Sequence, residues 1–117
     1  MSEHEKIDYI EFPSCDLMAT KAFFNECFGW KFKDYGPDYT AFFDAGLMGG
    51  FFHSDTASKT QNGAALVVLY SETLEATEKK IKRTGGVVTR PIFSFPGGRR
   101  FHFTEPGGNE LAVWSEK

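Results

Sequence analysis

Two side chains able to move a proton stand out in this 117-residue sequence. Glu11 interrupts an otherwise apolar, strand-favouring run, and His102 lies between two phenylalanines. A carboxylate in the middle of a strand must be paired, hydrogen-bonded or hydrated, because burying it without a partner costs free energy. Glu11 therefore either forms a salt bridge with Arg100 or acts on a ligand or a proton. His102 is either a satisfied histidine among aromatic rings or part of a binding site.

Other polar side chains carry weaker signals. Arg99 and Arg100 follow a Gly-Gly pair. They either grip an anion, because guanidinium binds carboxylate or phosphate in a forked geometry, or belong to a solvated edge strand. His53 either lines a site or is the exposed end of a strand. Glu105 and Glu110 flank a tight Pro-Gly-Gly-Asn turn, and we expect both to be solvated.

The composition is that of one ordinary folded domain spanning residues 1–117, with hydrophobic residues at 41% and charged residues at 25%. A net charge of −3 gives no basic face for nucleic acid. No apolar run approaches the roughly 20 residues of a membrane span, and we expect a cytoplasmic protein. Cys15 and Cys27 are too few for a disulfide framework, so we expect both to be reduced.

Phenylalanine is unusually frequent, with 13 residues, and it occurs in doublets such as 42–43 and 51–52. Neighbouring side chains of a strand point to opposite faces, so each doublet places one ring on each side of a sheet. A sheet that is apolar on both faces must have both covered. We expect helices on one face and a second sheet, a subunit or a ligand on the other.

The elements that must position these residues follow the same order twice. The first half predicts a strand, a helix capped by Asp16 and Gly29, and three strands, at residues 7–12, 17–28, 31–34, 40–45 and 49–53. The second half predicts the same order at residues 64–70, 71–84, 87–93, 99–104 and 109–114. The two opening strands begin 57 residues apart, at 7 and 64, which indicates an internal duplication. We expect module 1 at about 5–53, a linker at 54–62 and module 2 at about 63–116.

Segments at the two ends of the chain resemble a known family. These are Tyr9-Ile10-Glu11-Phe12-Pro13, Asp16-Leu17, Ala22-Phe23-Phe24, Phe28-Gly29-Trp30 and the run from Arg100 to Leu111. They are similar to the glyoxalase/bleomycin-resistance/dioxygenase superfamily, also called vicinal oxygen chelate proteins, which includes lactoylglutathione-lyase-like proteins. The resemblance implies an α+β fold in which two βαβββ modules of mixed strands form a half-open cup, with helices outside. It also implies a small-molecule site inside the cup and a homodimer.

The resemblance places three of the four usual metal-ligand positions at Tyr9, near Leu66 and at Ala112, with the fourth near residues 51–53. None of the three is a usual ligand, and leucine and alanine have no donor atom at all. We therefore expect no metal cofactor at these positions and disfavour the usual metal-dependent glyoxalase I mechanism. A displaced site would have to use Glu11, His53 and His102.

Strand alternation applied to the resemblance predicts which side chains face the cup. Glu11 and His102 are the candidate catalytic residues, with the Glu11 carboxylate as a base and His102 as donor to a developing oxyanion. Arg100, Thr104 and Glu110 are expected to face inward with them. The candidate substrate-binding residues are Tyr9, Phe52, His53, Leu66, Val68, Arg100 and Trp114.

The sequence thus predicts a glyoxalase-like protein that binds a small molecule, with possible metal-independent lyase or isomerase activity on a carbonyl-bearing or aromatic compound. One alternative is a non-catalytic protein that sequesters a drug or metabolite, as in bleomycin resistance. The other is a metal-dependent lyase or dioxygenase with displaced ligands. The expected partners are a small molecule and a second copy of the chain, with neither nucleic acid nor membrane.

Overall fold

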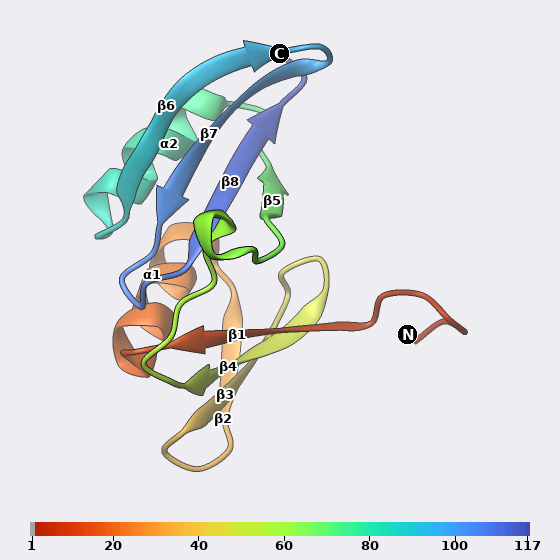
Figure 1. Cartoon of the computed structure of the whole chain (residues 1–117), viewed down its shortest axis with the longest axis vertical. Coiled ribbons are helices and arrows are strands. Elements are labelled where there is room, and N and C mark those ends of the chain that lie inside the picture. Colours follow the sequence, from red (N-terminus) through yellow and green to blue (C-terminus); the bar gives the residue numbers. More distant parts are fainter. Residues whose placement is uncertain (1) are drawn as a thin grey trace.

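The computed structural model describes residues 2–117, which form two βαβββ modules (Figure 1). Module 1 consists of β1 (Tyr9–Ser14), α1 (Leu17–Phe28), β2 (Lys31–Asp34), β3 (Tyr39–Phe43) and β4 (Met48–His53). A short 3-10 helix, η1 (Thr60–Asn62), lies in the connection. Module 2 consists of β5 (Val67–Tyr70), α2 (Leu74–Arg83), β6 (Val87–Phe95), β7 (Gly98–Thr104) and β8 (Glu110–Ser115).

Each module builds one open, four-stranded mixed sheet. The strand orders are β1-β4-β3-β2 and β5-β8-β7-β6. In both sheets the first and last strands of the module pair in parallel, and the other neighbours are antiparallel. The predicted α+β fold class of two βαβββ modules is therefore confirmed.

The ends of the elements show what the local sequence controls. The carboxylate of Asp16 accepts the N–H of Ala19, and Gly29 ends α1 with a left-handed φ of 75°, so α1 begins and ends as predicted. The second helix begins at Leu74 rather than Ser71, because the Ser71 hydroxyl accepts the N–H of Thr73 in a turn before it.

A pair of hydroxyl hydrogen bonds, one in each module, reflects the internal duplication. In module 1, Ser14 donates from its hydroxyl to Thr20 over 2.8 Å; in module 2, the hydroxyls of Ser71 and Thr77 lie 2.7 Å apart. Both members of the second pair stand 57 residues after those of the first. The same polar contact thus fixes the junction between opening strand and helix in both modules.

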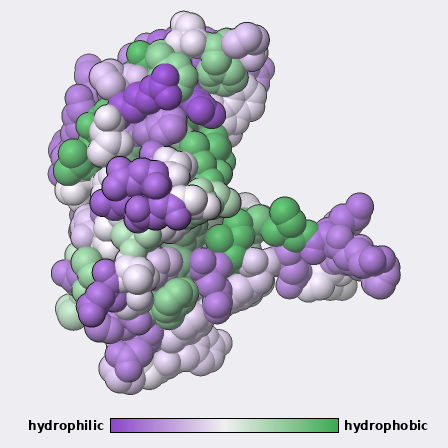
Figure 2. All heavy atoms as spheres, viewed as in Figure 1, coloured by the Kyte–Doolittle hydropathy of each residue, from purple (hydrophilic) through white to green (hydrophobic). Residues whose placement is uncertain are grey.

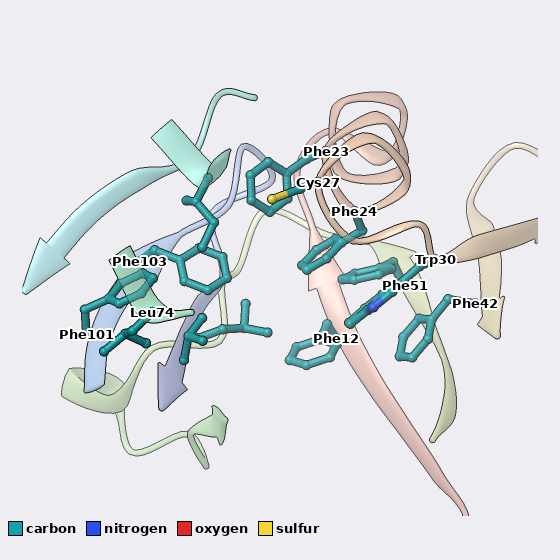
Figure 3. Packing of buried hydrophobic residues seen from close by; sticks show 13 residues of the cluster. Phe12, Phe23, Phe24, Cys27, Trp30, Phe42, Phe51, Leu74, Phe101 and Phe103 are labelled. Carbon is teal, nitrogen blue, oxygen red and sulfur yellow. The ribbon is translucent and has the colours of Figure 1, made fainter. Parts of the chain in front are cut away.

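Aromatic rings fill the core between α1 and the first sheet (Figure 3). Phe24 stacks on Trp30 with centroids 4.4 Å apart and lies 5.5 Å from Phe51. Phe51 is fully buried, whereas its neighbour Phe52 is 38% exposed on the other face. The Phe42–Phe43 doublet divides in the same way, so the predicted distribution of doublet rings is confirmed.

The two modules share this core and leave apolar groups exposed elsewhere. Phe23 of α1 lies 5.9 Å from Phe103 of β7. On the faces away from the core, large side chains remain exposed in both sheets: Tyr9, Met48, Phe52, Val68 and Tyr70. Figure 2 shows further hydrophobic groups where the N-terminal segment leaves the body. Within residues 2–117, no helix is long and apolar enough to cross a membrane.

Candidate functional site

Polar side chains line the face of β7 that points away from α2. Phe101 and Phe103 are fully buried in the core, and the alternation of the strand places Arg100, His102 and Thr104 on the opposite face. The parity predicted for these residues is therefore the one observed.

His102 and Glu110 form a shielded pair on this face. The Nδ1 of His102 lies 3.1 Å from a carboxylate oxygen of Glu110, and the two side chains are only 9% and 17% exposed. The other carboxylate oxygen accepts both the backbone N–H and the hydroxyl of Thr60 at 2.8 Å. The Nε2 of His102 is buried and has no hydrogen-bond partner within residues 2–117. The pair thus holds one imidazole nitrogen and leaves the other without a partner in the described chain.

This arrangement corrects the expectation that Glu110 is solvated. A loop residue, Thr60, covers its carboxylate, and β7 pairs with β8 so that His102 reaches it from the neighbouring strand. The alternation of β8 gave the only sequence signal for this role, because it places Glu110 on the face of Ala112.

The hydrogen bonds that Glu110 accepts predict a pH-dependent contribution to stability. Burial raises the pKa of Glu110, but hydrogen bonds from Thr60 and His102 lower it more, so the net pKa lies below the usual 4.5. A carboxyl with a lowered pKa stabilises the fold above its unfolded pKa, and this contribution is lost as pH falls through the folded pKa. We expect Glu110→Gln to lower the melting temperature at neutral pH and much less at about pH 3. Scanning calorimetry of Glu110→Gln and of the exposed Glu26→Gln tests this, and equal pH responses would contradict it.

Arg99 and Arg100 lie in different environments. Arg99 pairs with Glu75 of α2 through both terminal nitrogens and is thereby neutralised. The guanidinium of Arg100 instead lies over the rings of Phe93 and Phe95, with its carbon 5.3 and 5.7 Å from their centroids. The Arg100 side chain makes no hydrogen bond or ion pair within the part of the chain that the structure describes, and its Nε is buried.

Glu11 does not form the salt bridge with Arg100 that was one of the two alternatives predicted from the sequence. Its carboxylate is exposed and accepts the hydroxyl of Tyr39 at 2.8 Å, and Tyr39 in turn accepts the hydroxyl of Tyr9 at 2.6 Å. Burial raises the pKa of Tyr39, and the neighbouring Tyr9 and Glu11 raise it further. Gly50 makes room for this contact, because a Cβ there would lie 2.1 Å from the Tyr39 hydroxyl and displace that side chain. No sequence pattern indicated this role for Tyr39.

Within one chain, the structure brings together only some of the predicted site residues. Arg100, His102 and Trp114 share one face of the second sheet, and Val68 lies on that face because it pairs with Ala112. Tyr9, Glu11 and Phe52 share one face of the first sheet. No hydrogen bond or ion pair joins Glu11 to His102 among residues 2–117. The two candidate catalytic residues therefore belong to separate clusters in a single chain.

His53 lies outside both clusters, and Leu66 precedes the strand that carries Val68. His53 is exposed at the end of β4, where it pairs with Ser14. Its side chain lies on the face opposite that of Phe52 and Glu11. Leu66 is half-buried just before β5. A cavity of about 220 Å³ between the modules is bordered by Val68, but otherwise mainly by core residues such as Trp30 and Phe42.

Glu105 is buried, contrary to the expectation that it is solvated. It accepts hydrogen bonds from the Thr20 hydroxyl at 2.8 Å, the Gly107 N–H at 2.6 Å and the Asn109 side-chain amide at 2.7 Å. Burial raises its pKa, and these donors counteract the rise. We call Thr20, Gly107 and Asn109 the Glu105 socket. Because Thr20 belongs to α1 and the others to the β7–β8 turn, the socket fastens the two modules together.

The positions that the resemblance assigns to metal ligands, at Tyr9, near Leu66 and at Ala112, carry few donor atoms. Tyr9, Leu66 and Ala112 offer one phenol and two side chains without donor atoms. Within residues 2–117, no three histidine, cysteine, aspartate or glutamate side chains lie close enough together to hold a metal ion. Glu11, His53 and His102 accordingly form no displaced site within one chain.

Comparison with known proteins shows which family this chain belongs to. The model of the Glyoxalase/Bleomycin resistance protein/Dioxygenase superfamily matches residues 6–113. The chain belongs to this superfamily. No curated protein matches it.

Solved structures of the superfamily share the fold at low sequence identity. The genomically encoded fosfomycin resistance protein FosX from Listeria monocytogenes is 17% identical, with a TM-score of 0.78 over 97% of this chain and 94% of that chain. A family enzyme from Burkholderia phytofirmans is 12% identical, with a TM-score of 0.77 over 94% and 98%. The lactoylglutathione lyase from Agrobacterium tumefaciens is 16% identical, with a TM-score of 0.72 over 97% and 95%. At these identities the similarity shows the fold alone.

Proposed function

We propose that this superfamily member binds a carbonyl-bearing or aromatic small molecule against the β7–β8 face and acts on it as a metal-independent lyase or isomerase. The observation that carries the proposal is the His102–Glu110 pair. One imidazole nitrogen is held by a carboxylate, and the other is buried without a partner. A buried polar atom without a partner is costly and therefore calls for an explanation, which a proton-transfer role supplies.

The pair supports proton transfer by an ordinary acid–base route. The Glu110 carboxylate can only accept from Nδ1–H, which leaves the lone pair of Nε2 as a base. When Nε2 takes a proton from the carbon next to a carbonyl, the C–H electron pair moves to the carbonyl oxygen and forms an enolate. Returning the proton to another carbon completes an isomerisation, and expelling a leaving group completes an elimination. Arg100 is the donor on this face that can hold the acid or carbonyl oxygen next to the reacting carbon, where the negative charge of the enolate develops.

A homodimer gives Glu11 a place in this proposal. Both sheets leave apolar side chains exposed on the faces away from the core, and a second copy of the chain would cover them. Pairing the first sheet of one protomer with the second sheet of the other would set the Tyr9–Tyr39–Glu11 cluster opposite His102. Glu11 would then act as the second proton-transfer group. Sedimentation showing only monomer at micromolar concentration would contradict this assembly.

Non-catalytic binding of a drug or metabolite is the second candidate function. The rings of Tyr70, Phe95 and Trp114 lie side by side on this face, with Trp114 centroids 5.3 Å from Tyr70 and 6.4 Å from Phe95. Such a row binds flat molecules whether or not a proton moves. The third candidate is a metal-dependent reaction. Stoichiometric nickel, zinc, iron or manganese in elemental analysis of the purified protein would favour it.

A ligand screen followed by matched histidine variants tests the proposal. Thermal shift with carbonyl-bearing and aromatic compounds identifies ligands, and product formation is then followed for each. We expect His102→Gln and Glu110→Gln to lower kcat about 100-fold or more while binding persists, because general acid–base groups contribute about that much. His53→Ala, an exposed histidine, should leave kcat unchanged. Full turnover by His102→Gln would exclude the catalytic pair, and binding without product for every ligand would favour the sequestering function.

A further inference from the structure

Arg100 carries a positive charge that no acidic group of the described chain balances. Its guanidinium makes no hydrogen bond or ion pair within residues 2–117, although its Nε is fully shielded from water. Arg99, the adjacent residue on the opposite face, is fully paired with Glu75. A shielded guanidinium N–H without an acceptor costs free energy. Nε is the one Arg100 nitrogen that is buried, so its terminal nitrogens, unlike those of Arg99, are accessible and unpaired in the described chain, and an acceptor from outside the chain can reach them.

The surroundings of Arg100 add positive charge. The guanidinium carbon of Arg90 lies 3.7 Å from the ring centroid of Phe93, the same ring that Arg100 approaches at 5.3 Å. Arg90 also has no acidic partner within residues 2–117. The nearest carboxylate in the site, Glu110, is already bonded to His102 and Thr60. The face therefore attracts an anion.

The geometry favours one kind of anion and one kind of chemical group attached to it. A guanidinium that lies over aromatic rings keeps its edge for acceptors, and a planar carboxylate fits that edge with two parallel hydrogen bonds. Phosphate fits the same edge, but strong phosphate sites add successive backbone N–H groups or a helix N-terminus, and this face of paired strands presents neither, so a carboxylate is favoured. Beside Arg100 lie the rings of Phe95 and Trp114, which suit a flat apolar body.

We infer that the ligand of this site is an aromatic carboxylate, with its carboxylate on Arg100 and its ring against Phe95 and Trp114. This inference rests on the proposed function, because it assigns a ligand class to the same site. His102 lies two residues along β7 from Arg100 on the same face, beyond the carboxylate end of such a ligand.

Benzoate and its neutral isostere benzamide test the inference with the intact protein. Binding is followed by calorimetry and by tryptophan fluorescence, in which Trp114 lies at the site and Trp30 in the core. We expect benzoate to bind about tenfold to a hundredfold more tightly than benzamide, and its binding to weaken as salt rises. Arg100→Met should abolish the preference for benzoate, Arg100→Lys should keep part of it, and Arg99→Met should leave it unchanged.

Each outcome decides the inference. Equal affinities for the two probes, no benzoate binding at millimolar concentration, or equal effects of the Arg99 and Arg100 variants would overturn it. Arg100→Lys, which keeps the charge, covers the case in which Arg100→Met does not fold. The inference stands apart from the proposed catalysis, because His102→Gln should still bind benzoate. Benzoate binding that depends on Arg100, together with turnover that survives His102→Gln, would exclude the catalytic pair alone.

Discussion

Replacing Glu105 by alanine is expected to lower the free energy of unfolding by about 3 kcal/mol. The change leaves the Gly107 N–H, the Asn109 amide and the Thr20 hydroxyl with one acceptor fewer in a shielded place. It also opens a cavity where a side chain that is 1% exposed had been. Because the Glu105 socket joins α1 to the β7–β8 turn, the loss weakens the contact between the modules as well as the turn itself. Urea denaturation of the variant measures the change.

The control for this variant is Glu26→Ala, the same substitution at an exposed position of α1, which should change the free energy of unfolding by at most about 0.5 kcal/mol. The pH adds a second check. Burial raises the pKa of Glu105, so its contribution is fully present below its unfolded pKa and is lost as pH rises through the folded pKa. The difference between wild type and Glu105→Ala should therefore be larger in acid than at neutral pH. Equal losses for Glu105→Ala and Glu26→Ala would show that the socket does not hold the modules.

Local signals were sufficient to predict the elements. Asp16 and Gly29 set the ends of α1 because a cap needs only its own few neighbours. The doublet Phe51–Phe52 divided between the two faces of its strand because the side-chain period of a strand is two. The spacing of 57 residues was visible in the pattern, and the structure repeats it in the serine–threonine contacts.

Contacts between distant segments could not be predicted in the same way. Glu105 is buried because Thr20, which is 85 residues away in the chain, packs over it. Strand alternation predicts that Arg99 and Arg100 point to opposite faces. The pairing of Arg99 with Glu75 depends in addition on where α2 packs. The partner of Glu11 is Tyr39, which reaches it only because residue 50, on the intervening strand, is a glycine. In each case the partner is decided by packing.

The candidate site shows the same division. Alternation placed His102 and Arg100 correctly on one face of β7, because both belong to one strand. Glu11 and His102, which were expected to face one cavity, belong to different modules. The hydrophobic pattern of each module does not determine how the two modules are placed relative to each other. Within one chain, His102 pairs instead with Glu110 of the adjacent strand.

Replacing Phe51 by alanine is expected to lower the free energy of unfolding by about 3 to 5 kcal/mol, whereas Phe52→Ala should cost less than about 1 kcal/mol. Phe51 is fully buried and stacks between Phe12 and Phe24, at 5.3 and 5.5 Å, so its loss leaves a cavity between β1 and α1. Phe52 lies on the opposite face of β4 and is 38% exposed. The adjacent residues thus make a matched pair with the same chemistry, and chemical denaturation of both variants measures the difference.

The same pair separates stability from binding. Phe52 belongs to the face of the first sheet that carries Tyr9 and Glu11, which the proposed homodimer turns toward the ligand. Phe52→Ala should therefore weaken ligand binding or dimerisation in a protein of nearly normal stability. Phe51→Ala should destabilise the fold, and at temperatures where it stays folded it should bind the ligand as the wild type does. Similar stability losses for the two variants would contradict the observed alternation of β4, and unchanged binding and assembly by Phe52→Ala would remove this face from the site.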